Sequence, residues 1–225
     1  MIMTRTILVP LTVLLVGFAT TAFAQGPGRH FPLDHRQPPG VAARWNTLIQ
    51  PQRYAAPQQV QVTLPSEGSL TFYQGSPQAK VVVPTATQVG MQVGYVYRVR
   101  ISDMPEFPGV ELFPTIELID RLHPPAGLET QFPVPITIEA SEIEVALQDR
   151  MVTKVIYLEQ PSLAHPSSQE GTIRVEDFGP RANLLQAADL RGRPIAILRL
   201  GGRIPDPQSP SDEFYSRSPL VIASP

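Results

Sequence analysis

The chain has 225 residues, with 18 Lys and Arg against 20 Asp and Glu, so its formal net charge of −2 gives no basic surface for nucleic acid. It contains no cysteine, which excludes disulfides, thiolate metal sites and thiol nucleophiles together. Proline is abundant, at 26 residues, and the sequence has no phosphate-binding loop, dinucleotide-binding glycine motif, zinc-protease motif or nucleophile elbow. We therefore expect no cofactor, no metal site and no nucleic-acid partner.

The first 24 residues have the pattern of a secretory signal peptide. Arg5 gives a short positive region, residues 7–18 are apolar, and Ala22-Phe23-Ala24 places small residues where signal peptidase reads them. We predict cleavage before Gln25 and export to the periplasm, the envelope or the outside of the cell, with no stable membrane span afterwards. An uncleaved anchor is the alternative, although about 20 apolar residues are needed to span a bilayer.

Residues 25–57 are predicted to form a flexible basic arm. They hold six prolines, four arginines and one acid, which bury too little apolar surface to offset the entropy of ordering the chain. Trp45, Leu48 and Ile49 are an exception, because a helical turn places them on one face. Three interpretations remain open for this turn: docking on the folded body, an anchor for a protein partner centred on the only Trp, or disorder.

Residues 58–204 are predicted to be the folded body, followed by a flexible tail at residues 205–225. Alternating or short apolar runs bounded by Pro and Gly predict strands at residues 59–64, 69–73, 80–83, 95–101, 110–119, 136–139, 152–158, 172–175 and 195–200. Strands that follow one another with frequent turns favour a mainly β fold. We expect an antiparallel β-sandwich, immunoglobulin-like or similar, with two short helices.

The two helices are expected at residues 141–149 and 181–190. Ser141 and Glu144 match a capping box at the start of the first helix, and Gly192 is a suitable residue after the end of the second.

The strand at residues 110–119 contains Pro114, which cannot donate a backbone hydrogen bond, so this strand is expected at a sheet edge or with a bulge. Glu111 and Glu117 on this strand are expected to pair with Arg98 and Arg100 across a hairpin. The alternative, a glycosidase carboxylate pair, needs more than this spacing.

Asp120 and His123 form the most polar candidate loop. A carboxylate beside an imidazole occurs in catalytic triads and behind metal ligands. However, no serine lies in a recognisable nucleophile context, so we interpret Asp120 as a residue that bonds turn amides, and we assign no catalytic residue.

Tyr95 and Tyr97 are a candidate aromatic platform for stacking on a sugar. They share the more apolar face of their predicted strand, which favours burial in the core over exposure.

Four stretches of the sequence resemble a group of uncharacterised secreted bacterial proteins: residues 108–117 (PGVELFPTIE), 120–125 (DRLHPP), 155–159 (VIYLE) and 197–203 (ILRLGGR). The resemblance covers roughly residues 95–203. It implies export and the extent of the folded part, and it brings no activity, cofactor or catalytic residue.

The sequence favours an exported, non-catalytic β-sandwich module for protein interaction or assembly in the cell envelope. Edge strands suit the addition of a partner's strand, and proline-rich extensions suit tethering. The expected partner is an envelope or secreted protein. The alternative is a secreted protein that binds or cleaves carbohydrate.

Overall fold

The computed structural model describes residues 33–49, 56–160, 175–208, 214–216 and 218–222. These residues belong to a unit that begins at Pro32. The predicted signal peptide with its cleavage site, and the predicted strand at 172–175 apart from Val175, lie outside the described residues. In the described ranges, no helix is long and apolar enough to cross a membrane.

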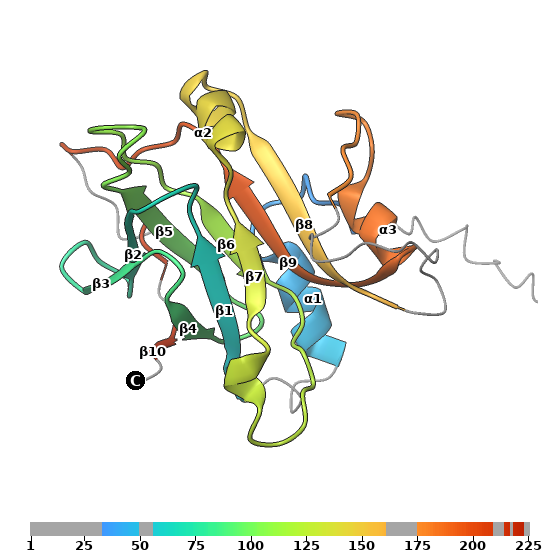
Figure 1. Cartoon of the computed structure of the whole chain (residues 1–225). Helices are drawn as coiled ribbons and strands as arrows, with labels where there is room; N and C mark the ends of the chain where they lie inside the picture. The colour runs from blue at the N-terminus through green and yellow to red at the C-terminus, as the bar shows by residue number, and fades with distance from the viewer. Residues whose placement is uncertain (1–32, 50–55, 161–174, 209–213, 217, 223–225) are drawn as a thin grey trace, which may run out of the picture. The chain divides into compact units, whose positions relative to one another are not determined.

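Two β-sheets pack face to face (Figure 1). In the described part, the first sheet has four strands, in the order β10 (Leu220–Ile222), β4 (Gln88–Met91), β1 (Gln58–Thr63) and β7 (Val134–Thr137). The second has six described strands, in the order β3 (Lys80–Pro84), β2 (Ser69–Tyr73), β5 (Val96–Ser102), β6 (Thr115–Leu118), β9 (Gly192–Leu200) and β8 (Val152–Glu159). Described neighbours are antiparallel apart from β1 and β7, which are parallel. The predicted mainly β sandwich is confirmed.

The core lies between the sheets and follows from the alternation of the strands. Val60 and Val62 of β1 are buried in it, while Gln61 between them faces the other side and is half-buried. From the opposite sheet, β5 contributes Tyr97, Val99 and Ile101 to the same core. Every second residue therefore faces the core on both strands, which is the period that the sequence predicts.

Two helices cover the outer face of the six-stranded sheet. They are α1 (Val41–Ile49) and α3 (Leu184–Asp189), and their residues Ala42 and Leu185 share an apolar cluster with Ile119 and Ile197. Because this second layer covers β6 and β9 from outside, all four residues of β6 are buried.

β6 is a central strand, so the edge position expected from Pro114 is wrong. β6 begins directly after this proline, and the register with β5 continues past it without a bulge to a bridge between Ile101 and Leu112. The Pro114 carbonyl still accepts a hydrogen bond from the Val99 N–H at 3.0 Å. The proline therefore removes one donor from the ladder and leaves the pairing intact.

The helix predicted at residues 141–149 forms as α2 (Ala140–Leu147), after the 3-10 turn η2 (Glu129–Gln131) and β7. Its predicted cap is displaced by two residues. Glu139 is the N-cap residue, and the Glu142 carboxylate accepts a hydrogen bond from the Glu139 N–H at 2.9 Å. Glu139 and Glu142 therefore take the places that the sequence analysis gives to Ser141 and Glu144.

The described half of the predicted arm, residues 33–49, docks on the six-stranded sheet. The Ala43 N–H donates to Glu117 Oε1 at 3.0 Å, and the Asn46 side chain donates to the Ile119 carbonyl at 3.0 Å. Arg199 of β9 donates to the His35 carbonyl at 3.0 Å. These contacts make the segment part of the folded body, in place of the flexible arm expected from its composition.

The described end of the predicted flexible tail is also docked. Phe214 and Tyr215 are buried against Tyr73 and Phe113, and β10 extends the four-stranded sheet. We call residues 214–222 the C-terminal strap; Arg217 within it is outside the described residues.

Candidate functional site

The open edges of the sheets differ in length and in proline content. Among the described strands, β8 is the longest edge strand, with eight residues and no proline. β3 ends at Pro84, β7 contains Pro135, and β10 has three residues. Short length and proline are the devices by which proteins block unwanted pairing at an edge. β8 is therefore the edge best suited to accept another strand.

The register of β9 shows which backbone groups of β8 face this open edge. The Ile119 N–H donates to the Ile195 carbonyl at 2.8 Å, so the odd-numbered residues of β9 bond toward β6. The even-numbered residues of β9 then bond toward β8, where Lys154 is opposite Leu198. Because successive residues of a strand point their backbone groups to opposite sides, the N–H and C=O groups of Thr153 and Val155 point to the open edge. No hydrogen bond to these groups occurs within the described ranges.

Packing holds β8 from both faces. Val152 and Ile156 pack on the core between the sheets, and Val155 packs on the cluster under α1 and α3. The Lys154 ammonium is directed inward, 2.7 Å from Glu142 Oε1 of α2. An inward charge limits non-specific pairing, and a break of register between Ile156 and Tyr157 ends the regular stretch. The edge open to a partner is thus rigid and short, at residues 152–156.

The α1 helix presents two of the three predicted anchor residues to solvent. The side chains of Trp45 and Leu48 are 56% and 63% exposed, whereas that of Ile49 lies outside the described residues. The helix docks through Ala42 and Ala43, which are small and buried. The periodicity predicts the helix and its apolar face correctly, but the face that docks is a different one. The partner-anchor interpretation of this face stays a prediction.

The structure does not bring Tyr95 and Tyr97 together on one surface. Tyr95 precedes β5 and is 42% exposed, whereas Tyr97 is 1% exposed. The Tyr97 hydroxyl accepts from the Gln92 N–H at 2.6 Å and donates to the Pro219 carbonyl at 2.7 Å, and burial raises its pKa. A ring buried in this way cannot stack on a sugar.

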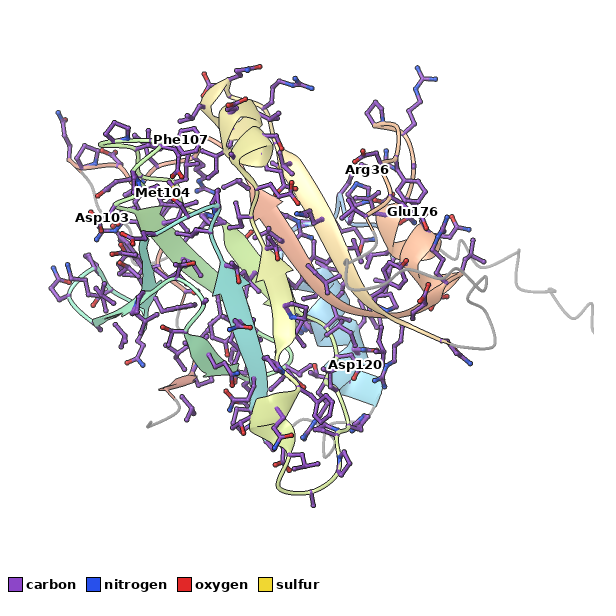
Figure 2. The ribbon with its side chains drawn as sticks, viewed as in Figure 1. Arg36, Asp103, Met104, Phe107, Asp120 and Glu176 are labelled. Atoms are coloured by element: carbon purple, nitrogen blue, oxygen red, sulfur yellow. The ribbon has the colours of Figure 1, made fainter. Side chains whose placement is uncertain are left out.

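Asp120 is buried at the end of the β6 region, where its carboxylate bonds the neighbouring turn (Figure 2). Oδ1 accepts from the Arg121 N–H at 2.8 Å, and Oδ2 lies 3.3 Å from the Arg193 guanidinium. His123 is exposed. The described residues contain no cluster of three acidic or imidazole side chains that could hold a metal ion. The contacts of Asp120 are those of a turn residue.

His35 is a buried titratable group that the sequence analysis passes over. Its Nδ1 accepts from the Leu184 N–H at 3.2 Å, at the start of α3, and lies 3.0 Å from Asp34 Oδ1. Burial lowers the pKa of His35; Asp34 opposes this, while Arg36 and Arg199 add to it. The neutral ring is the form whose Nδ1 can accept from Leu184.

Arg36 supplies the counter-charge for Asp34 on this side of the molecule (Figure 2). Its side-chain hydrogen bond is the main cause that lowers the pKa of Asp34 to about 2. The Asp34 carboxylate is thereby stabilised as an anion without a proton on His35.

We expect the free energy of unfolding to fall as the pH drops below 6.5, the ordinary pKa of histidine. Unfolded His35 binds a proton in this range, whereas the folded state resists protonation. This contribution is present above pH 6.5 and is lost toward the lower folded pKa. His35→Asn retains an acceptor and does not titrate, so urea unfolding at pH 7 and pH 5 should show a smaller loss in the variant. Equal losses would contradict the assignment.

No family model, curated protein or solved structure matches the chain. The resemblance to secreted bacterial proteins stays a prediction.

Proposed function

We propose that this chain is an exported, non-catalytic β-sandwich module that binds a protein partner in the cell envelope or outside the cell, by adding an extended strand of the partner to β8. The observation that carries this proposal is the outward direction of the N–H and C=O groups of Thr153 and Val155 on the proline-free edge strand β8. In strand addition, main-chain hydrogen bonds provide affinity and alternate side chains provide specificity.

The surroundings of the edge indicate the chemistry of the partner strand. Val152 and Ile156 are only half-buried, although both belong to the core face. A strand beside β8 would cover their exposed parts with every second side chain. The preferred partner is therefore an extended segment with apolar residues at alternate positions on one face.

Export is the part of the proposal that depends on the predicted signal peptide. The carbohydrate alternative has lost its main support, because Tyr97 is buried in the core and cannot form an exposed platform with Tyr95. Trp45 and Leu48 on α1 offer a second contact surface to the same class of partner.

Thr153→Pro is expected to abolish partner binding while the sandwich remains folded. The Thr153 N–H faces away from β9, so proline removes no hydrogen bond of the native sheet and places its ring where the added strand would lie. Wild type and variant would each be used to retain proteins from an envelope fraction of the producing cells. A protein retained in stoichiometric amount by wild type should be lost with the variant, and its binding should protect the amides of Thr153 and Val155 from hydrogen exchange.

Val82→Pro is the matched control on the opposite edge of the same sheet. The hydrogen bond from the Gln74 N–H to the Ala79 carbonyl sets the β2–β3 register so that the Val82 N–H also faces outward. This variant should retain the partner as wild type does. A partner that is retained equally by Thr153→Pro, or a retained polysaccharide without protein, would contradict binding at β8.

A further inference from the structure

The C-terminal strap lies in a groove that is built for it. Phe214 packs edge to face on Phe113 at 5.4 Å between ring centroids, and Tyr215 packs at a tilt on Tyr73 at 4.6 Å. The guanidinium of Arg98 lies 4.5 Å from the centre of the Phe214 ring, and its Nε donates to the Phe214 carbonyl. These four aromatic rings are all buried. The first part of the strap is thus held by a small core of its own.

Two serines of the strap replace a missing strand beside β5. β2 pairs with β5 only from Val99 to Ser102, so no described strand pairs with the earlier residues of β5 on that side. There the Ser216 hydroxyl accepts from the Arg98 N–H at 2.8 Å, and the Ser218 hydroxyl donates to the Val96 carbonyl at 2.6 Å. The side chains of the strap thereby satisfy backbone groups that a neighbouring strand would otherwise pair.

The strap then crosses to the other sheet. The Pro219 carbonyl accepts from the buried Tyr97 hydroxyl, and β10 pairs antiparallel with β4, with Val221 opposite Gly90. The strap therefore contacts both sheets. If the groove were empty, the Arg98 N–H, the Val96 carbonyl and the edge of β4 would lose these hydrogen-bond partners.

The described part of the chain that leads to the strap lies at the surface, with Gly202 close to Asp149 after α2. Residues 201–208 are all exposed or half-exposed, and they contain Gly201, Gly202, Pro205 and Pro207. The strap is therefore held by its own contacts in the groove. Of these eight residues, Arg203 contacts the strap, with its guanidinium 5.7 Å from the centre of the Phe214 ring. Residues 209–213 lie outside the described residues.

We propose that the C-terminal strap is exchangeable, and that it docks in the same groove of a second copy of this chain. Exchange between copies can retain the contacts of the described strap residues with the groove, which is why such swaps are a low-cost route to dimers. The groove would select the strap of a second copy because the strap presents, in this order, two aromatic rings, two hydroxyls, a carbonyl and a short apolar strand. The groove is separate from the β8 edge, so this assembly goes beyond the proposed binding of another protein.

Single-cysteine variants test the exchange directly, because the chain has no cysteine of its own. A Cβ at Gly90 would lie 3.2 Å from the Val221 Cβ, so β4 and β10 need to separate only slightly to reach the roughly 3.5–4.5 Å found in disulfides. Gly90→Cys and Val221→Cys proteins would be mixed at high concentration and oxidised. A disulfide between positions 90 and 221 can then form only between two chains.

Gln78→Cys mixed with Val221→Cys is the control for random collision, since Gln78 is exposed and lies before β3, in the other sheet from β10. Exchange should give about tenfold more 90–221 than 78–221 disulfide, because a docked pair reacts at a high effective concentration. An equal yield, together with a 90–221 bond formed within one chain of the Gly90→Cys/Val221→Cys double variant, would overturn the proposal.

A second measurement on the unmodified chain does not depend on the cysteines. Sedimentation of the wild type at increasing concentration should reveal a dimer that Phe214→Ala removes, because this substitution empties the aromatic part of the groove. A wild type that stays monomeric throughout the concentration range would overturn the proposal.

Discussion

Glu117→Ala is expected to lower the free energy of unfolding by about 3–5 kcal/mol, the usual cost of removing one partner of a buried ion pair. Glu117 is 0% exposed and Arg199 is 9% exposed, with Glu117 Oε2 2.8 Å from the Arg199 guanidinium. Without the carboxylate, the guanidinium remains buried between β6, β9 and the segment before α1. The Ala43 N–H would also lose its acceptor, so the docking of α1 would weaken with the sheet.

Glu111→Ala is the matched control in the same hairpin. Glu111 pairs with Arg100 at 3.0 Å, but its side chain is 50% exposed, so its removal should cost less than about 1 kcal/mol. Urea unfolding of both variants at neutral pH measures the difference. Replacing Glu117 and Arg199 together by apolar residues should recover part of the loss. Equal losses in the two single variants would show that the buried pair is no more important than the exposed one.

The strands were predictable because their period of two is local, whereas the partners of their polar residues were not. The expected pair of Arg100 with Glu111 forms across the hairpin. Glu117 pairs instead with Arg199, which is 82 residues further along the chain. No local pattern indicates that α1 covers this face and turns a half-exposed strand into a buried one. The burial of Glu117 depends on the tertiary contact alone.

Amino-acid composition predicted flexible segments at both ends of the described chain, where the structure has docked ones, for a related reason. Proline and serine in residues 205–225 predict a flexible tail, because their side chains bury little apolar surface. In the strap, the hydroxyls of Ser216 and Ser218 bond the backbone of β5, and two aromatic residues provide the burial. In the arm, Ala42 and Ala43 dock because they are small, while the larger Trp45 stays exposed.

For the candidate binding edge, the strand could be predicted from the sequence, but its position in the sheet could not. The strand at residues 152–158 is expected from its apolar run, and it is β8 in the structure. Its position at an edge depends on strand order, which the sequence does not reveal. β4 is missed as a strand because its four residues include a glycine and only two large apolar side chains. Without β4, the sheet that receives the strap could not be assembled.

Gly192→Ala is expected to destabilise the fold by about 3 kcal/mol or more, through overpacking between β8 and β9. From the sequence, Gly192 is expected to be the residue that ends a helix, a role that uses a positive φ angle. In the structure the φ angle of Gly192 is not positive. Glycine is required at this position because a side chain has no room there. A Cβ at this position would lie 2.0 Å from the Leu158 carbonyl oxygen and 2.9 Å from the carbonyl carbon. Both are backbone atoms, so the two strands must separate to admit a methyl group.

Gly179→Ala is the control for the loss of glycine itself, because nothing lies within 4 Å of a Cβ there and the φ angle is again not positive. Its effect should stay within about 0.5 kcal/mol, as for other surface substitutions. Thermal and urea unfolding of the two variants would measure the difference, and hydrogen exchange should show faster opening of β8 near Leu158 in Gly192→Ala. A Gly192→Ala protein as stable as the control would mean that β8 can move away from β9 without cost. The edge would then be too pliable to present Thr153 and Val155 as a fixed template for a partner strand.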